Sequence, residues 1–396
     1  MKSKKILLTL IILSNMLLTG CPAGREVNKL AIVASVGIDK AGDGYLVTYQ
    51  IINPKAIASK KSVAESPVIL YTDTGKDLFE ILRRITTQSP RKIYGSHLRT
   101  IVFGEEMAKE GIQKTLDFYV RDHEYRTDFY FLVAKGTTAN NILKVITPLE
   151  PIPGIKLYDT LEASEESWAP TKTIKIFDLV NDLIADGKNP VLTGVEVRDP
   201  MNNSNSIESL KQSDTSQLIL SSLAAFKKDK LAGWLNESES KGYNYITGNV
   251  KDTIGFIQYD EHNQITFEII KAKAKPKVYL LSDKPAISVE ILLKVNLAAQ
   301  TGDLDITAKD VLDKTSRKLE EKTENVCNDA IKHTKELEAD VFGFGEEIHR
   351  AYPKLWQSIK SDWNKEFVDL PVNVKVDIEI NNLGEATKSI FSKGSK

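Results

Sequence analysis

The hydrophobic and polar positions of the 396-residue chain follow different patterns in its two halves. Near the start, residues 30–36 form an apolar run and residues 45–52 alternate, with a polar, turn-like segment at 39–44 between them. These three segments predict a β-hairpin. Strand-like and helix-like stretches then alternate as far as residue 197. This order predicts a mixed α/β N-terminal half.

Two breaks interrupt the pattern. Pro148, Pro151 and Pro153 predict a loop inside the first half. Residues 199–216 are polar, contain few apolar residues and show no period, so they are predicted to be a linker.

The segment 217–260 after this linker is set apart as a middle segment. Within it, residues 218–226 predict a strand, and residues 231–238 predict a short helix that carries Trp234.

The second half is predicted to be a sheet followed by helices. Residues 254–259 and 265–272 flank the polar segment 260–263 and predict a hairpin, and strand-like residues continue through 287–297. We therefore expect an antiparallel sheet here. The period then becomes helical, and an apolar stripe predicts an amphipathic helix of about eight turns docked on the sheet. The stripe consists of Leu312, Leu319, Val326, Ala330, Leu337 and Val341.

Two further elements complete the chain. Residues 348–363 predict a second helix with Pro353 near its start, and residues 372–380 alternate as a half-covered strand does. The expected fold is α+β and multidomain, with a mixed α/β N-terminal half and a C-terminal antiparallel sheet packed against long amphipathic helices. The C-terminal domain is placed at 261–396.

The first residues have the composition of a targeting signal. A cationic start is followed by an apolar stretch at 6–18, which is shorter than the roughly 20 residues of a membrane-spanning helix. The stretch ends in Leu18-Thr19-Gly20-Cys21, which resembles the lipobox of bacterial lipoproteins. The resemblance implies that residues 1–20 are a lipoprotein signal peptide and that Cys21 is the lipid attachment site. The alternative is an ordinary secretory signal with a chance cysteine.

Composition and charge exclude several classes of protein. Hydrophobic residues make up 41% of the chain and charged residues 27%, which is ordinary for globular proteins and excludes collagen, disordered polymers and polytopic membrane proteins. The 53 basic and 54 acidic residues nearly cancel, so no nucleic-acid partner is expected. The two cysteines cannot form a disulfide scaffold.

The sequence contains no pattern that predicts a metal, cofactor or catalytic site. No two histidines lie three to five residues apart and there is no Cys-x-x-Cys, so no metal ligands are expected. Phosphate-binding and nucleophile motifs are absent as well, so neither cofactor-binding nor catalytic residues are predicted. The histidines are His97, His123, His262, His333 and His349.

Three charged or reactive features have ordinary structural interpretations. Cys327 lies beside the helical stripe and is predicted to be a buried, inert cysteine. Acidic pairs such as Glu165-Glu166 are typical of solvated faces or helix N-termini. The charged segment 121–126 is either a salt-bridged connector or a surface recognition loop.

Short motifs in both halves resemble those of the Ger(x)C family, the lipoprotein C subunits of nutrient germinant receptors in endospore-forming bacteria. The motifs are distributed over nearly the whole mature chain, and their order and spacing are specific to the family. They include Gly20-Cys21, Gly37-Ile38-Asp39, Ser96-His97, Arg121-Asp122, Leu192-Thr193-Gly194-Val195, Gly233-Trp234-Leu235, and Asp340-Val341-Phe342-Gly343-Phe344-Gly345 with Trp356 and Trp363.

The resemblance implies a function without catalysis. It places an N-terminal family domain at 21–198 and the C-terminal one at 261–396. It implies that the partners are the integral membrane subunits of the receptor, and membrane lipid through acylated Cys21. It also implies a lipid-anchored location on the outer face of the spore inner membrane, and a role in nutrient-triggered germination.

Two other classes of protein remain as alternatives. A solute-binding lipoprotein of a transporter would have two similar α/β lobes around a cleft. A lipoprotein hydrolase would need a nucleophile motif, which the sequence lacks.

Overall fold

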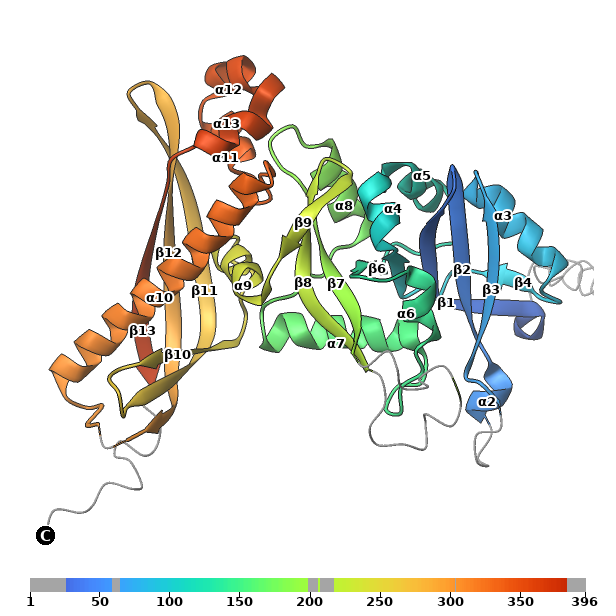
Figure 1. Ribbon diagram of the computed structural model, residues 1–396, viewed down its shortest axis with the longest axis horizontal. Helices are drawn as coiled ribbons and strands as arrows, with labels where there is room; N and C mark the ends of the chain where they lie inside the picture. The colour runs from blue at the N-terminus through green and yellow to red at the C-terminus, as the bar shows by residue number, and fades with distance from the viewer. Residues whose placement is uncertain (1–25, 59–64, 199–205, 207–216, 303, 383–396) are drawn as a thin grey trace, which may run out of the picture.

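The structure is a computed structural model that describes residues 26–58, 65–198, 206, 217–302 and 304–382. The chain folds into two sheets placed side by side along the long axis of the molecule, each with its own helices (Figure 1). Cys21 and, apart from Ser206, the predicted linker 199–216 lie outside the described residues. The α+β fold class is confirmed, with a mixed sheet in the N-terminal half.

The first sheet contains nine strands of the described residues in the order β3-β2-β1-β5-β6-β7-β8-β9, with β4 paired to β1. The hairpin predicted at its start is confirmed, because β1 and β2 pair antiparallel from Val33↔Ile51 to Ala41↔Gly44. Strands β5, β6 and β7 continue parallel to β1, whereas β8 is antiparallel to β7 and β9 is antiparallel to β8. The strands are β1 Leu30–Ala41, β2 Gly44–Ile52, β3 Val68–Gly75, β4 Lys92–Tyr94, β5 Thr100–Phe103, β6 Tyr130–Ala134, β7 Val191–Arg198, β8 Gln217–Lys227 and β9 Lys230–Leu235.

Helices cover both faces of this sheet, and alternate strand residues face opposite sides, as β geometry requires. On one face Phe103 and Phe131 pack with helices α3, α4, α5 and α8, and on the other Val102 and Leu132 pack with α6 and α7. The helices are α2 Pro54–Ala58, α3 Leu78–Arg84, α4 Glu105–Glu110, α5 Gln113–Arg121, α6 Ala139–Lys144, α7 Pro153–Ser167 and α8 Ile176–Ile184, and short 3₁₀ turns span Val27–Lys29 and Ile85–Thr87.

Helix α7 begins inside the proline-rich segment that was predicted to be a loop. Pro153 occupies its first turn, where a proline without an N–H group is tolerated because that N–H would have no helical partner. The predicted loop therefore ends at residue 152, and Pro153 is the first residue of α7.

The prediction of a helix at 231–238 is wrong. Residues Lys230–Leu235 form strand β9, and Trp234 pairs with Ala224 of β8. Lys228 adopts a φ of +56° in the tight turn, and cross-strand pairing then fixes the extended conformation. Helix α9, Glu237–Ile246, starts directly afterwards with an Asn236 cap. The segment 217–260 is thus divided between the two sheets.

The second sheet has the order β10-β11-β12-β13. Its strands are β10 Thr253–Gln258, β11 Gln264–Leu281, β12 Lys284–Thr301 and β13 Val372–Asn382. Strands β10, β11 and β12 are antiparallel as predicted, but β13 is parallel to β12, from Ile287↔Val372 onward. The helices between β12 and β13 bring the chain back to the start of β12, which is the connection that a parallel pair requires.

Helix α10, Lys309–Glu336, covers one face of the second sheet (Figure 1). Its 28 residues give a length of about 42 Å, close to the predicted eight turns. Leu319 and Ala330 of the predicted stripe are buried, but the helix ends at Glu336, because Glu338 has a φ of +49°. Val341 therefore packs beyond the helix.

Side chains of α10 also occupy both edges of the second sheet. At the β13 edge, Glu324 Oε1 accepts from Val376 N at 3.0 Å and Glu320 Oε1 accepts from Ile378 N at 3.2 Å. At the β10 edge, Lys322 Nζ donates to Phe256 O at 2.7 Å, and Lys318 Nζ donates to Gln258 O and Tyr259 O. These bonds satisfy edge groups that would otherwise be free to pair with another strand.

The helix predicted at 348–363 is divided into pieces. They are α11 Phe344–Ala351, α12 Pro353–Ile359, a 3₁₀ turn Lys360–Asp362 and α13 Trp363–Asp369. Pro353 starts α12, because it has no N–H group with which to continue α11.

Limited proteolysis of residues 22–396 is expected to cut first within 199–216, since this stretch has the polar, aperiodic composition of a linker. The two fragments should stay together in native size-exclusion chromatography, because β7 and β8 pair on either side of the cut. First cuts inside α10, or fragments that separate without denaturant, would contradict this prediction.

Candidate functional site

The described residues contain no cluster of three His, Cys, Asp or Glu side chains that could hold a metal ion. Cys327 is fully buried, as predicted, with Sγ 3.9 Å from Gly242 O, and burial raises the pKa of its thiol. Such a thiol is a poor nucleophile. None of the helices in the described part of the chain is long and apolar enough to cross a membrane.

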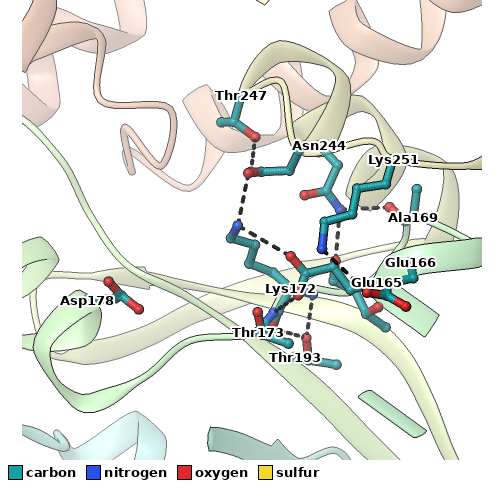
Figure 2. A network of polar contacts seen from close by, with 12 residues as sticks. Glu165, Glu166, Ala169, Lys172, Thr173, Asp178, Thr193, Asn244, Thr247 and Lys251 are labelled. Carbon is teal, nitrogen blue, oxygen red and sulfur yellow. Dashed lines mark hydrogen bonds and ion pairs between the residues drawn. The ribbon is translucent and has the colours of Figure 1, made fainter. Parts of the chain in front are cut away.

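A network of polar contacts lies where the two sheets meet, and we call it the junction network (Figure 2). It connects the end of α7 and the loop after it with Thr193 of β7, helix α9 and the turn that follows α9. The members used below are Glu165, Glu166, Trp168, Ala169, Lys172, Thr173, Thr193, Asn244, Asn249, Lys251 and Thr253.

Lys172 lies at the centre of the junction network. Its Nζ donates to Asn249 Oδ1 at 2.9 Å and lies 3.7 Å from Glu165 Oε1. Its backbone is fixed to Thr193, whose Oγ1 accepts from Lys172 N at 2.9 Å and donates to Lys172 O at 2.8 Å. The ammonium group thus joins a carboxylate from the first half to an amide from the segment after α9.

Two buried side chains hold the loop after α7 against the second half. Asn244 Nδ2 donates to Ala169 O at 2.7 Å and to Thr171 O at 3.0 Å. Thr253 Oγ1 donates to Trp168 O at 2.9 Å. Because buried carbonyls need partners, these bonds fix the loop in place.

The acidic pair of α7 departs in part from its predicted solvated position. Glu166 is exposed, 4.0 Å from Lys251. Glu165 is buried near the end of the helix, and its Oε2 accepts from Thr173 N at 2.8 Å. Helical spacing distinguishes the two, because Glu165 lies on the same face of α7 as the buried Leu157 and Leu161, whereas Glu166 does not.

A second contact between the halves is formed by the loop after α10. Asp340 is fully buried, and its carboxylate accepts from Gly343 N at 2.9 Å, Gly345 N at 2.8 Å and Trp363 Nε1 at 3.1 Å. Asp340 O accepts from Asn189 N at 2.7 Å. Asp340 therefore both caps the start of α11 and anchors the loop to the first half.

Two glycines allow the backbones to approach at this second contact. A Cβ atom on Gly187 would lie 2.5 Å from the carbonyl carbon of Gly345, and one on Gly345 would lie 2.7 Å from Gly187 Cα. Any side chain at either position would push the halves apart.

Between the two polar contacts lies an apolar cluster shared by both halves. It is formed by Val191, Leu223, Ala225, Leu235, Tyr243, Ala339 and Val341. With polar contacts around it, the cluster fixes the relative orientation of the two sheets.

The charged segment 121–126 has the contacts of a salt-bridged connector. Arg121 Nε lies 2.8 Å from Asp117 Oδ1, and Glu124 pairs with Lys92. The segment also lines a cavity in the first half.

Comparisons with known proteins agree with the fold and with the motifs. A family model described as "Spore germination protein N-terminal domain" matches residues 24–197, and one described as "Spore germination B3/ GerAC like, C-terminal" matches residues 221–384. Spore germination protein KC of Bacillus subtilis (strain 168) is 30% identical over 396 residues, covering 97% of each chain. Spore germination protein B3 of the same organism is 23% identical, covering 94% of this chain and 96% of the relative.

A solved structure shares the architecture. The crystal structure of the GerBC protein matches with a TM-score of 0.57 at 20% identity, covering 88% of this chain and 97% of that chain. The fold thus defines a class of two-sheet α+β proteins. The chain belongs to the Ger(x)C family of spore germination proteins, as its motifs predict. This is not a known enzyme family.

Proposed function

We propose that the chain is the lipid-anchored subunit of a spore nutrient germinant receptor and acts through protein contacts to trigger germination. The match of both family models across residues 24–197 and 221–384 carries this proposal. The residues buried between the halves support it, since they hold two dissimilar domains in one orientation and so present a fixed surface to a partner.

The partners in this proposal are the integral membrane subunits of the receptor. The anchor is a diacylglycerol group on Cys21, which follows the signal peptide at residues 1–20. Acyl chains contribute about 0.8 kcal/mol per buried methylene, so two chains attach a protein stably. The location proposed is the outer face of the spore inner membrane.

The solute-binding lipoprotein of a transporter is less well supported. That class has two similar lobes, whereas here a nine-stranded mixed sheet is joined to a four-stranded sheet under one long helix. A rise in melting temperature on addition of amino acids or sugars would favour this alternative. Co-purification of integral membrane subunits with the lipidated protein from spores would favour the receptor.

Replacing Cys21 with alanine is expected to abolish acylation, because only the thiol can accept the diacylglycerol group. The variant should remain an uncleaved precursor without acyl label, measured by mass spectrometry and metabolic labelling. Cys327→Ala is the matched control and should be acylated and cleaved normally, since Cys327 is buried in the folded domain. A Cys21→Ala protein that matures to the wild-type mass and still partitions with membranes would refute the anchor.

A further inference from the structure

A cavity of about 840 Å³ opens on the first half, among helices α3 and α5, strand β4 and the segment after α5. This size is typical of sites for small organic molecules. The cavity lies far along the chain from the junction network and shares no residue with it. The proposed receptor function assigns no role to this cavity.

The cavity has an apolar, aromatic floor. Leu78 and Ile93 are buried beneath it, and the rings of Phe79 and Phe118 meet edge to face at 6.2 Å. Phe79 is 46% exposed, so part of its ring is accessible to a ligand.

The floor is held in place before any ligand arrives. Phe118 contacts the ring of Tyr119 at 4.9 Å and that of Tyr125 at 5.6 Å, and both tyrosines are buried. A ring supported on two sides loses little freedom when a ligand packs on it.

The carboxylates that line the cavity are already engaged. Asp117 pairs with Arg121 and Glu124 with Lys92, while Asp77 Oδ1 accepts from Glu80 N at 2.8 Å as the cap of α3. Asp122 Oδ1 accepts from Glu124 N at 2.9 Å.

Two of the lining cations, by contrast, are not held in ion pairs within the described part of the chain. Lys114 is exposed on α5 and forms no ion pair there. Arg83 stacks on the Phe79 ring, with its guanidinium carbon 4.8 Å from the ring centroid, and forms no ion pair there either. Asp77 and Asp122 keep their charge, because the groups that donate to them are neutral backbone N–H groups. What the cavity offers a ligand is an ammonium and a guanidinium group that are not held in ion pairs, beside an aromatic surface.

We propose that this cavity binds a small organic anion with an aromatic or branched apolar body. The body packs on Phe79 and Phe118, and the anionic group lies near Lys114 and Arg83. An uncharged ligand would leave those cations without a partner, and a purely polar anion would leave the exposed aromatic surface uncovered. This inference is independent of the proposed receptor function.

Two fluorescent probes with the same ring system test the proposal. 1-Anilinonaphthalene-8-sulfonate carries an anionic group, and N-phenyl-1-naphthylamine lacks it. The protein used is residues 22–396, which contains every described residue and omits the proposed lipid attachment site Cys21. We expect the sulfonate to bind about tenfold more tightly than the neutral amine, measured by fluorescence titration.

Variants separate the two halves of the proposed site. Lys114→Gln should weaken binding of the sulfonate about fivefold and leave the neutral probe unchanged, since only charge is lost. Phe79→Ala should weaken both probes about tenfold, since the packing surface is lost. Lys55→Gln and Phe177→Ala are controls, because Lys55 is exposed and Phe177 is 57% exposed, and neither lines the cavity. Both should bind as the wild type does.

Three outcomes would overturn the proposal. They are equal affinity for the two probes, wild-type binding by both cavity variants, and equal losses in the control variants. Unfolding can be excluded as a cause of lost binding, because the substituted side chains are exposed and the circular dichroism of each variant can be compared with that of the wild type.

Discussion

Val376→Asp is expected to unfold the C-terminal half, at a cost of about 4 kcal/mol in the free energy of unfolding. Val376 is 2% exposed on β13 and packs in the core beneath α10. An aspartate there would lose its hydration without gaining a cation. It would also lie near Glu324, whose carboxylate accepts from Val376 N at 3.0 Å, so the two negative charges would repel each other. Urea unfolding of residues 22–396 measures this loss.

Asn373→Asp is the matched control for this substitution. Asn373 is exposed on the same strand, three residues earlier. The same new charge should change the free energy of unfolding by no more than about 0.5 kcal/mol there. Similar losses in both variants, or none in Val376→Asp, would show that β13 does not share a core with α10.

Asp340→Ala is expected to cost about 3 kcal/mol and to loosen the contact between the halves. The substitution leaves the N–H groups of Gly343 and Gly345 and the indole N–H of Trp363 without their acceptor in a buried site. Hydrogen exchange of the indole proton and thermal unfolding both measure the effect. A wild-type melting temperature would refute the capping role of Asp340.

The pH dependence of stability gives a second test of Asp340. Burial raises the pKa of its carboxyl from the ordinary 3.8 to about 6. The folded state therefore holds the proton more tightly than the unfolded state does. This contribution to stability is complete below about pH 4 and is lost as the pH rises through about 6. Asp340→Asn does not titrate, so the stability of the wild type relative to this variant should fall between pH 4 and 6. A difference that rises over this range would contradict the assignment.

Elements with a strong local pattern could be predicted from the sequence. The first hairpin has turn residues between two runs, and helix α10 has a stripe over many turns. Strand β9 could not be predicted, because its helix-compatible composition is overridden by pairing with β8. The parallel direction of β13 was missed as well, since alternation along a strand contains no information about its partner.

The contacts between the halves could be predicted even less well from the sequence. Helical spacing places Glu165 on the buried face of α7 with Leu157 and Leu161, but it does not indicate that its carboxylate accepts from Thr173 N or lies near Lys172. In the sequence, Asp340 is recognisable only as one residue of a family motif. Its role became clear when the structure placed the N–H groups of Gly343, Gly345 and Trp363 around its carboxylate.

The cavity of the first half also depends on distant segments. Phe79 and Lys114 are more than thirty residues apart, and neither position is marked by a sequence motif. Their proximity follows from the packing of α3 and α5 on the same face of the first sheet.

Germination of spores that carry Val376→Asp as their sole copy tests the receptor function most directly. Loss of optical density is followed after addition of a nutrient to which spores with the wild-type protein respond, and separately after a non-nutrient trigger that bypasses nutrient receptors. We expect the Val376→Asp spores to fail with the nutrient and to germinate normally with the bypass trigger, and Asn373→Asp spores to respond to both. Equal loss of both responses in the Val376→Asp spores, or a full nutrient response despite an unfolded C-terminal half, would contradict the receptor function.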